Sequence, residues 1–485
     1  MLQGARRITI VGGGFSGATT AVQLVRRSPA PLAITVIEPR ARIGGGLAYS
    51  SDEPDHRING QPGLHSLDPL EQDMFVRWYD QAGAARADPQ ATLANGTTFP
   101  RRSTFRAFLE ETVARHAAWP SGSTILHVRD RAGDILPTGN AFSVMTAGGE
   151  RHACDLVILA PGHTGARLPA AFGSQAPTQA GIIADPLGAS RLPPIAPQER
   201  VLVLGSGLTA YDIVSTLVSR GHAGTIDVVS RHGLKPKLQR KPPEPGQPPP
   251  LPILERDAVA PESFILSAGS PPTVRALLHA LRQRVDEAAR SGETWDGPFD
   301  HLRDIIRQFW PSLAATEKRR FFRHLRPWYD IHRFRVAPQN QAIVSAAEAR
   351  GQVRFRAARV EGAAPGDEAG SIRVVLRAHG AGHAQAARYD RVLNCTGVDA
   401  TPHATLPLYA ALLERGLISL DASGVGVAVD ARCRAIGRDS RVAERLRVVG
   451  PPPLGAHGDA SGGAFIAVQI HRMIPDALGV LGIIT

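Results

Sequence analysis

Two copies of one turn pattern in this chain have the residue types that hold phosphate groups. The small residues of the pattern are Gly12, Gly14 and Gly17 in the first copy and Gly205, Gly207 and Ala210 in the second. The first glycine permits a sharp turn, the second lets the backbone approach a pyrophosphate, and the third small residue lets helix and strand pack closely. The amino terminus of the helix then directs free N–H groups and the positive end of its dipole at the phosphates. The sequence therefore predicts two dinucleotide sites, and two dinucleotides in one chain indicate electron transfer between them.

A side chain of opposite charge follows each turn at the same spacing. Glu38 comes 21 residues after Gly17, and Arg231 comes 21 residues after Ala210. A carboxylate at this place accepts hydrogen bonds from ribose hydroxyls and repels a 2′-phosphate, so the first site should take FAD or NAD and not NADP, and our hypothesis is FAD. An arginine at this place pairs with a 2′-phosphate, so we expect NADPH in the second site. NADH, with its adenine stacked on Arg231, stays open as the alternative.

Residues around each turn complete the two expected cofactor sites. The residues expected to contact FAD are Gly12, Gly14, Phe15, Ser16, Gly17, Glu38, Pro39, Arg40, Gly45, Gly46, Ala160, Gly162 and Gly450. The residues expected to contact the nicotinamide dinucleotide are Gly205, Ser206, Gly207, Leu208, Thr209, Ser230, Arg231, Thr396 and Gly397, with His232 as a further hydrogen-bonding group.

Two polar clusters outside the turns are candidates for contacting a substrate. The run DEPDHRING has side chains that could face a cofactor ring or the substrate, or cap a loop. The run RPWYDIHRFR mixes cations, aromatic rings and one carboxylate, which suits a polar anionic substrate such as an amino acid or an oxidised purine. The residues proposed for catalysis are His56, Asn59, Arg326, Tyr329 and His332, and the further substrate contacts are Asp330 and Arg333. An amphipathic structural helix stays open as the alternative for the second run.

The elements that must position these residues repeat in two halves of the chain. In each half, a strand–turn–helix–strand unit is followed by a strand-like run and a returning apolar strand, which ends at APG in the first half and at CTG in the second. This order predicts an α/β fold with two Rossmann-like dinucleotide-binding domains, the second inserted in the first, and an additional helical insertion. The predicted limits are residues 1–165 and 398–485 for the FAD-binding domain, 196–235 and 346–397 for the NAD(P)H-binding domain, and 236–345 for a proline-rich loop and helical insertion.

Two parts of these domains have clear helical patterns. Apolar residues at three-to-four spacing predict helices over residues 274–290 and 299–310 of the insertion. The run SGGAFIAVQIHRM, residues 461–473, predicts a helix with a glycine-rich start. The positive end of that helix could stabilise negative charge on a flavin ring, and packing alone stays open as its role.

Composition and cysteine content narrow the class of protein. The 485 residues have a formal net charge of +11, and no basic run is interleaved with aromatic residues, so we expect no nucleic-acid partner. The three cysteines, Cys154, Cys395 and Cys433, have no paired spacing, which indicates a reducing compartment and argues against a disulfide framework, a metal site and a dithiol reductase. The amino terminus enters the first turn unit directly, and the run ALGVLGIIT is too short to span a bilayer, so we expect a cytoplasmic protein without a membrane partner.

The two turns, the stretch GLAYS-x-x-x-P-x-H-x-x-N at residues 46–59 and the two returning strands resemble the FAD/NAD(P)-binding protein superfamily. The segment RHLRPWYDIHRFR at residues 323–335 makes the chain most similar to a bacterial branch related to flavin-dependent monooxygenases, which include amino-acid N-hydroxylases and a urate hydroxylase. Two departures are visible. Many relatives have an aspartate after the glycine of the closing turn, where this chain has Pro451, with Asp459 as a possible substitute. The first returning strand ends at APG where ATG is commoner.

The resemblance implies a single-component monooxygenase that uses FAD, NADPH and dioxygen. Such an enzyme hydroxylates a small polar substrate, an amino acid, amine or urate-like purine, through a flavin C4a-hydroperoxide. An NAD(P)H reductase or dehydrogenase without oxygen insertion would share every cofactor motif, and so would a flavin-binding redox sensor. Both alternatives stay open, and the sequence gives no indication of the oligomeric state.

Overall fold

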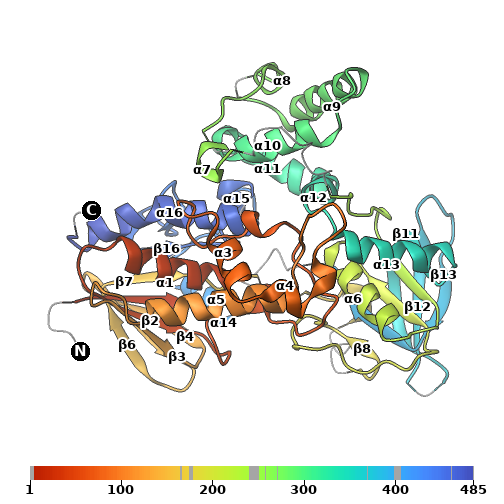
Figure 1. Cartoon of the computed structure of the whole chain (residues 1–485), viewed down its shortest axis with the longest axis horizontal. Helices are drawn as coiled ribbons and strands as arrows, with labels where there is room; N and C mark the ends of the chain where they lie inside the picture. Colours follow the sequence, from red (N-terminus) through yellow and green to blue (C-terminus); the bar gives the residue numbers. More distant parts are fainter. Residues whose placement is uncertain are drawn as a thin grey trace.

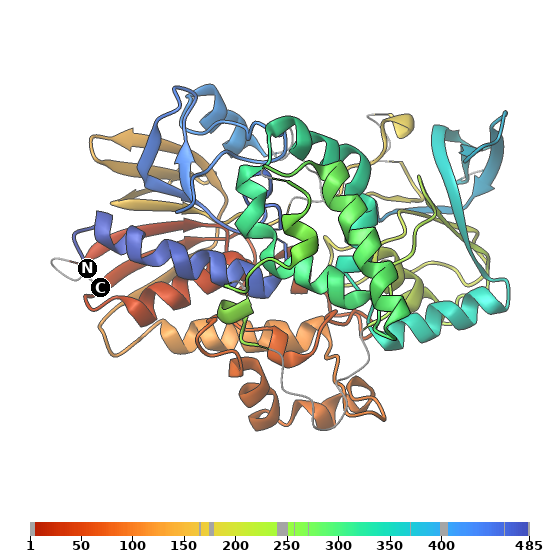
Figure 2. The same cartoon turned by 90° about the horizontal axis from the view of Figure 1, so that it is seen from above.

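The computed structural model describes residues 5–163, 166–173, 179–239, 251–256, 258–269, 271–368, 370–397, 406–459 and 461–483. Two sheets form two lobes, and the helices between residues 253 and 333 lie along one side of both lobes (Figure 1). Seen from above, these helices lie in front of the region where the two lobes meet (Figure 2).

The first lobe is built on a six-stranded sheet with the strand order β15-β16-β7-β1-β2-β3. All neighbouring strands are parallel except β15 and β16. The strands are β1 (Arg6–Val11), β2 (Leu32–Ile37), β3 (Thr124–Val128), β7 (Leu156–Leu159), β15 (Arg434–Ile436) and β16 (Val442–Val448). The central strand β7 is a continuous apolar run that is buried along its whole length, as expected of a parallel strand covered on both faces.

Different layers cover the two faces of the first sheet. On one face, α1 (Phe15–Arg27), α5 (Arg102–His116) and α16 (Gly463–Val480) share one apolar core with β1, β2 and β7. On the other face lie α14 (Pro407–Glu414) and an antiparallel sheet of β4 (Ala132–Thr138), β5 (Ala141–Thr146) and β6 (Arg151–Cys154). The start of α1 therefore lies beside the start of α16.

The second lobe is built on a seven-stranded sheet with the strand order β13-β12-β11-β10-β9-β14-β8. The strands are β8 (Ile182–Ile183), β9 (Val201–Leu204), β10 (Ile226–Ser230), β11 (Val353–Pro365), β12 (Ile372–Ala378), β13 (Gln385–Tyr389) and β14 (Arg391–Asn394). The helices α6 (Leu208–Ser219) and α13 (Pro338–Ala349) pack on it. All strands of the second sheet lie between β7 and β15 in the sequence, which confirms two Rossmann-like domains with the second inserted in the first. The domain limits stay predictions.

The helical insertion contains both helices that the sequence predicted. They are α9 (Val274–Arg290) and α10 (Asp296–Phe309), and Trp310 after α10 donates a hydrogen bond from Nε1 to the carbonyl oxygen of Gly455 at 2.8 Å. This buried indole fixes the insertion to the first lobe. Of the proline-rich loop, residues 240–250 lie outside the described residues.

Shorter elements complete the described chain. The helices are α2 (Gly46–Tyr49), α3 (Met74–Gln81), α4 (Ala84–Ala87), α7 (Ile253–Arg256), α8 (Ser263–Leu266), α11 (Ala315–Arg320), α12 (Arg326–Arg333) and α15 (Leu454–His457), and the other short turns of helix are η1 (Pro62–Leu64), η2 (Pro89–Ala91), η3 (Ala170–Phe172), η5 (Trp310–Ser312) and η6 (Phe321–Leu325). Among the described residues, no helix has the length and apolar composition needed to cross a membrane.

Ion pairs tie the two lobes to each other. Arg102 on α5 of the first lobe pairs through Nη2 with Oδ2 of Asp212 on α6 at 2.6 Å. Glu53, which follows α2, pairs with Arg220 at the end of α6 at 2.5 Å. Because Asp212 and Glu53 are buried, these contacts hold the lobes in one relative orientation.

Candidate functional site

The first glycine turn has the shape of a phosphate cradle. Gly12 has a φ of +99°, and a Cβ atom added there would overlap the carbonyl oxygen of Ala160 at the end of β7. A Cβ atom added at Gly17 would overlap the carbonyl oxygen of Gly12. Gly14 is the N-cap of α1, and no side chain caps the helix there. The amino terminus of α1 therefore has free N–H groups beside a turn that admits only glycine, which fits a dinucleotide pyrophosphate.

Glu38 lies directly beside this turn. Its Oε2 atom accepts a hydrogen bond from the N–H of Gly13 at 2.8 Å, and its Oε1 atom accepts one from the N–H of Arg40 at 3.0 Å. Glu38 is buried, whereas Pro39 and Arg40 are exposed. The carboxylate is thus held at the end of β2, where it fits the hydroxyls of an unphosphorylated ribose.

Other expected FAD residues gather around the same turn. The N–H of Gly44 donates to the carbonyl oxygen of Gly13 at 2.7 Å, so the loop that contains Gly45 and Gly46 lies against the turn. Gly450, with a φ of +81°, lies against the side chain of Ser16. The ring of Phe15 would lie 3.3 Å from a Cβ atom at Gly463, the first residue of α16.

The second glycine turn repeats the geometry of the first. Gly205 has a φ of +98°, and a Cβ atom there would overlap the carbonyl oxygen of Cys395 at the end of β14, as Gly12 does with Ala160. Gly207 is the N-cap of α6, and a Cβ atom added there would have no neighbour within 4 Å. Ser206 Oγ donates to the carbonyl oxygen of Leu234 at 2.5 Å. The second turn is therefore also shaped for a phosphate and is open in front of its helix.

Arg231 lies immediately after β10, beside this second turn. The residue is exposed, and no ion-pair partner is found for it among the described residues. Ser230 Oγ accepts the N–H of Gly233 at 3.0 Å, which shapes the turn that presents Arg231 and His232. A free guanidinium at this point fits a phosphate on the adenosine ribose.

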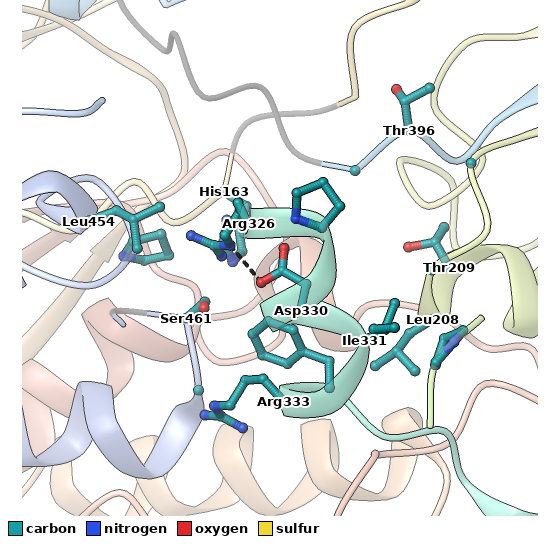
Figure 3. A pocket seen from close by; sticks show the side chains of 18 of the residues that line it. His163, Leu208, Thr209, Arg326, Asp330, Ile331, Arg333, Thr396, Leu454 and Ser461 are labelled. Atoms are coloured by element: carbon teal, nitrogen blue, oxygen red, sulfur yellow. Dashed lines mark hydrogen bonds and ion pairs between the residues drawn. The ribbon is translucent and has the colours of Figure 1, made fainter. Parts of the chain in front are cut away.

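A cavity of about 1600 Å³ joins the two lobes. It extends from the second turn, lined by residues 204–209, to residues 451–452 and 461–465 at the start of α16. One side of it is formed by α12, which crosses between Leu208 and Thr209 of the second lobe and Ser461 of the first (Figure 3). Thr396, Gly397 and Gly162 also line the cavity.

The α12 side chains in the cavity are ion-paired. Arg326 Nε lies 2.5 Å from Oδ1 of Asp330 (Figure 3), and burial raises the pKa of Asp330. Arg333 Nε lies 2.7 Å from Oδ2 of Asp459. Burial opposes ionisation of Asp459, yet the Arg333 guanidinium holds the pKa of this carboxyl well below its ordinary value. The Arg333 pair therefore fixes α12 to the segment before α16, and Asp459 is occupied by this role.

The structure brings only part of the proposed catalytic set to the cavity. Asn59 and Arg326 line it, and His56, Tyr329 and His332 do not. His56 is buried with Nδ1 2.7 Å from Ser51 Oγ, and burial lowers its pKa to about 3. Tyr329 is buried, with its hydroxyl 3.4 Å from Asp459, and His332 stacks on Phe299 at 4.2 Å. These three side chains have packing partners where the sequence suggested chemistry.

His163 and Arg102 line the cavity but were not among the residues proposed from the sequence. Burial and the nearby Arg326 lower the pKa of His163 to about 4, so its imidazole is neutral. Its place directly after the APG turn was a signal that could have found it. Arg102 has no such signal, because α5 is a plain amphipathic helix whose register alone brings Arg102 to the cavity.

The cysteines of the chain are buried, and the described residues contain no cluster of metal-binding side chains. The three cysteines are free and buried, and burial raises the pKa of Cys154 to about 11 and of Cys433 to about 12. Cys395 lines the cavity, and burial raises its pKa as well. No group of histidine, cysteine and carboxylate side chains that could hold a metal ion occurs among the described residues.

Comparison with known proteins agrees with this geometry. Residues 9–164 match a family model described as FAD-NAD(P)-binding. No curated protein sequence matches the chain. The matched segment lies in the first lobe and includes the first glycine turn and Glu38.

Solved structures with the same fold cover the whole chain. The ornithine N-hydroxylase of Kutzneria sp. 744 has a TM-score of 0.63 at 16% identity over 98% of this chain and 99% of its own. The cadaverine monooxygenase of Erwinia amylovora, solved with FAD, has a TM-score of 0.64 at 13% identity over 98% and 94%. The thioredoxin reductase of Lactococcus lactis has a TM-score of 0.53 at 11% identity over 98% and 99%. The chain therefore has the fold of flavoproteins with two dinucleotide-binding domains.

Proposed function

We propose that this protein is a single-component FAD-dependent monooxygenase that uses NADPH and dioxygen to hydroxylate a small polar substrate, an amino acid, amine or urate-like purine. The observation that carries the proposal is the cavity that joins the second glycine turn to the start of α16. An electron donor held at Gly205–Arg231 and a flavin held at the first turn would meet in this cavity.

Two parts of the first lobe would hold the two ends of the FAD molecule. The turn at Gly12–Gly17 would bind the pyrophosphate, and Glu38 would accept hydrogen bonds from the adenosine ribose. The isoalloxazine would lie toward Gly162, Pro451 and the start of α16, and when bound it would supply hydride acceptance and activation of dioxygen.

The residues of the cavity would orient the reactants and exclude water. The N–H groups at the start of α6 and the Arg231 guanidinium would hold the phosphates of NADPH. Ile331 and Phe334 line the side formed by the insertion and would keep water from the reaction. The amino terminus of α16 directs the positive end of its dipole at the cavity, where it would stabilise negative charge on a reduced flavin.

The shared fold with N-hydroxylases supports oxygen insertion over the alternatives. The Kutzneria structure is described with reduced FAD, NADP⁺ and L-ornithine, so the same arrangement of lobes serves that reaction. A dithiol relay of the kind used by disulfide reductases needs two thiols that exchange, and the buried thiols of this chain have raised pKa values.

The test is oxygen transfer by the purified, FAD-loaded protein. NADPH oxidation is measured with panels of amino acids, amines, organic acids and purines, together with hydrogen peroxide release. We expect one compound to stimulate NADPH oxidation with little peroxide, and its product to carry an atom from isotopically labelled dioxygen. Fast NADPH oxidation with an artificial acceptor but no label in any product would indicate a reductase. Failure of NADPH to bleach the flavin would indicate a redox sensor.

A further inference from the structure

The wall of the cavity is strongly cationic. Among the described residues that line it, thirteen are arginines and Asp330 is the single carboxylate. Most of these arginines have carboxylate partners behind the wall, as Arg102 has Asp212 and Arg57 has Asp88.

The inner part of the wall, near α12, carries slightly more cations than anions. Five guanidinium groups, those of Arg256, Arg303, Arg326, Arg333 and Arg335, face four carboxylates, those of Asp300, Asp304, Asp330 and Asp459. Arg256 is the least well paired, at 4.0 Å from Asp304, and burial lowers its pKa. Each of these four carboxylates is therefore already paired with a guanidinium group.

The rim of the cavity adds cations from the insertion. Arg319, Arg320 and Arg323 on α11 and η6 are exposed and line the cavity. Arg320 pairs with Glu317, and among the described residues Arg319 donates to the carbonyl oxygen of Ala422 across the rim, at 2.6 Å. Arg323 has no ion-pair partner among the described residues. Arg319 and Arg323 are thus available to a bound anion.

The two dinucleotides do not account for these rim cations. The first glycine turn, which would bind the flavin pyrophosphate, is not part of the cavity wall. The phosphates of NADPH have the second turn, the start of α6 and Arg231 in the other lobe. The rim arginines belong to the insertion instead, and Arg319 reaches the first lobe at the carbonyl oxygen of Ala422.

We propose that the substrate is a small organic anion with a carboxylate or phosphate group, and that Arg319 and Arg323 bind this group at the rim of the cavity. The inference rests on the proposed function, because it names the substrate class of the same site. Guanidinium groups bind both kinds of oxyanion through paired N–H donors. A diamine would lose its hydration on entering a cavity lined by guanidinium groups of the same charge, which disfavours its binding. Asp330, the one carboxylate among the described lining residues, is already paired with Arg326.

Binding is tested without turnover, so that oxygen chemistry cannot affect the result. The FAD-loaded protein is titrated anaerobically, without NADPH, while the flavin absorbance is recorded. The anions are succinate, citrate, L-glutamate and 3-phosphoglycerate, and the amines, which carry no carboxylate, are putrescine and cadaverine. We expect a saturable spectral change with at least one anion, a Kd that rises steeply with salt, and no saturation with the amines.

The rim is tested with the double variant Arg319→Gln/Arg323→Gln and a matched control. Arg373→Gln changes an exposed arginine on β12 that does not line the cavity. We expect the double variant to raise the Kd of the binding anion by about tenfold or more, since each lost charged hydrogen bond weakens binding to that extent. The control should leave the Kd unchanged.

The outcomes separate this inference from the proposed function. Saturable binding of an amine, no binding of any of the four anions, or an unchanged Kd in the double variant would overturn the inference. Anion binding that depends on the rim, in a protein that transfers no oxygen to any compound, would overturn the monooxygenase proposal and leave the anion site standing.

Discussion

Two glycines of the second turn should respond differently to the same substitution. Gly205→Ala puts a Cβ atom into the carbonyl oxygen of Cys395 at a positive φ, so we expect a loss of about 2–4 kcal/mol of stability. Gly207→Ala adds a Cβ atom in open space, so we expect a change within about 0.5 kcal/mol. Urea unfolding of the FAD-loaded protein measures both.

The substitution Gly207→Ala, which the fold should tolerate, should nevertheless impair ligand binding. The open space in front of this glycine is where a pyrophosphate would approach α6, so Gly207→Ala should weaken NADP⁺ binding even though the protein stays folded. Flavin absorbance changes on titration with NADP⁺ give the Kd. An unchanged Kd in Gly207→Ala would mean that the pyrophosphate does not pass over this turn.

Arg231 should decide between the two nicotinamide dinucleotides. Its guanidinium has no ion-pair partner among the described residues, and a bond from it to a 2′-phosphate is worth about 1.5–3 kcal/mol. Arg231→Ala should therefore weaken NADP⁺ binding by about tenfold to a hundredfold, with little effect on NAD⁺. The control is Arg354→Ala, an exposed arginine on β11 outside the cavity wall. Equal losses for NADP⁺ and NAD⁺ would instead support stacking on adenine.

At the element scale, one buried ion pair should hold α12 in place. Arg333→Met leaves the Asp459 carboxylate buried without its guanidinium, at a cost of about 3–5 kcal/mol. Asp459→Asn alone should also destabilise the protein, and the double variant should regain part of the loss. A coupling energy of about 1 kcal/mol or more in a urea-unfolding cycle is the expected result. Additive effects would show that α12 is held by other contacts.

Three neutral histidines with lowered pKa values, His56 buried and His163 and His457 half-buried, should make the whole fold sensitive to acid. Burial lowers the pKa of His56 to about 3 and those of His163 and His457 to about 4, from an ordinary value of 6.5. Below pH 6.5 the unfolded chain takes up protons at these side chains that the folded chain does not. The free energy of unfolding should therefore fall as the pH drops from 6.5 to 4, by about 1.4 kcal/mol per histidine and pH unit.

A single variant isolates one of these contributions. His457→Gln removes one imidazole outside the cavity wall, so its stability should fall less steeply with decreasing pH than that of the unchanged protein. Urea unfolding at a series of pH values across this window gives the slopes. Identical slopes would show that His457 is protonated as readily in the folded chain as in the unfolded one.

Much of the fold and of the cofactor sites could be predicted because they rest on local patterns. A glycine turn needs its spacing, and Glu38 and Arg231 follow from the length of one helix and one strand. The wall of the cavity could not be predicted in this way. Arg319 comes from the insertion and Arg102 from α5, and only the packing of the lobes brings them together. The burial of His56 could not be predicted either, because its sequence surroundings are polar.

The strand order has a consequence for how the protein is made. In the first lobe, β16 pairs with β7, and α16 shares an apolar core with α1. The lobe that starts with residues 6–37 is therefore complete only when residues 442–480 are present. The ribosome synthesises every strand of the second sheet before β16. The second lobe can therefore fold during synthesis. Until β16 is synthesised, the edge of β7 in the first lobe stays unpaired. A nascent chain that ends before Val442 would lack β16 and α16, so the first lobe, where we propose that FAD binds, would be incomplete.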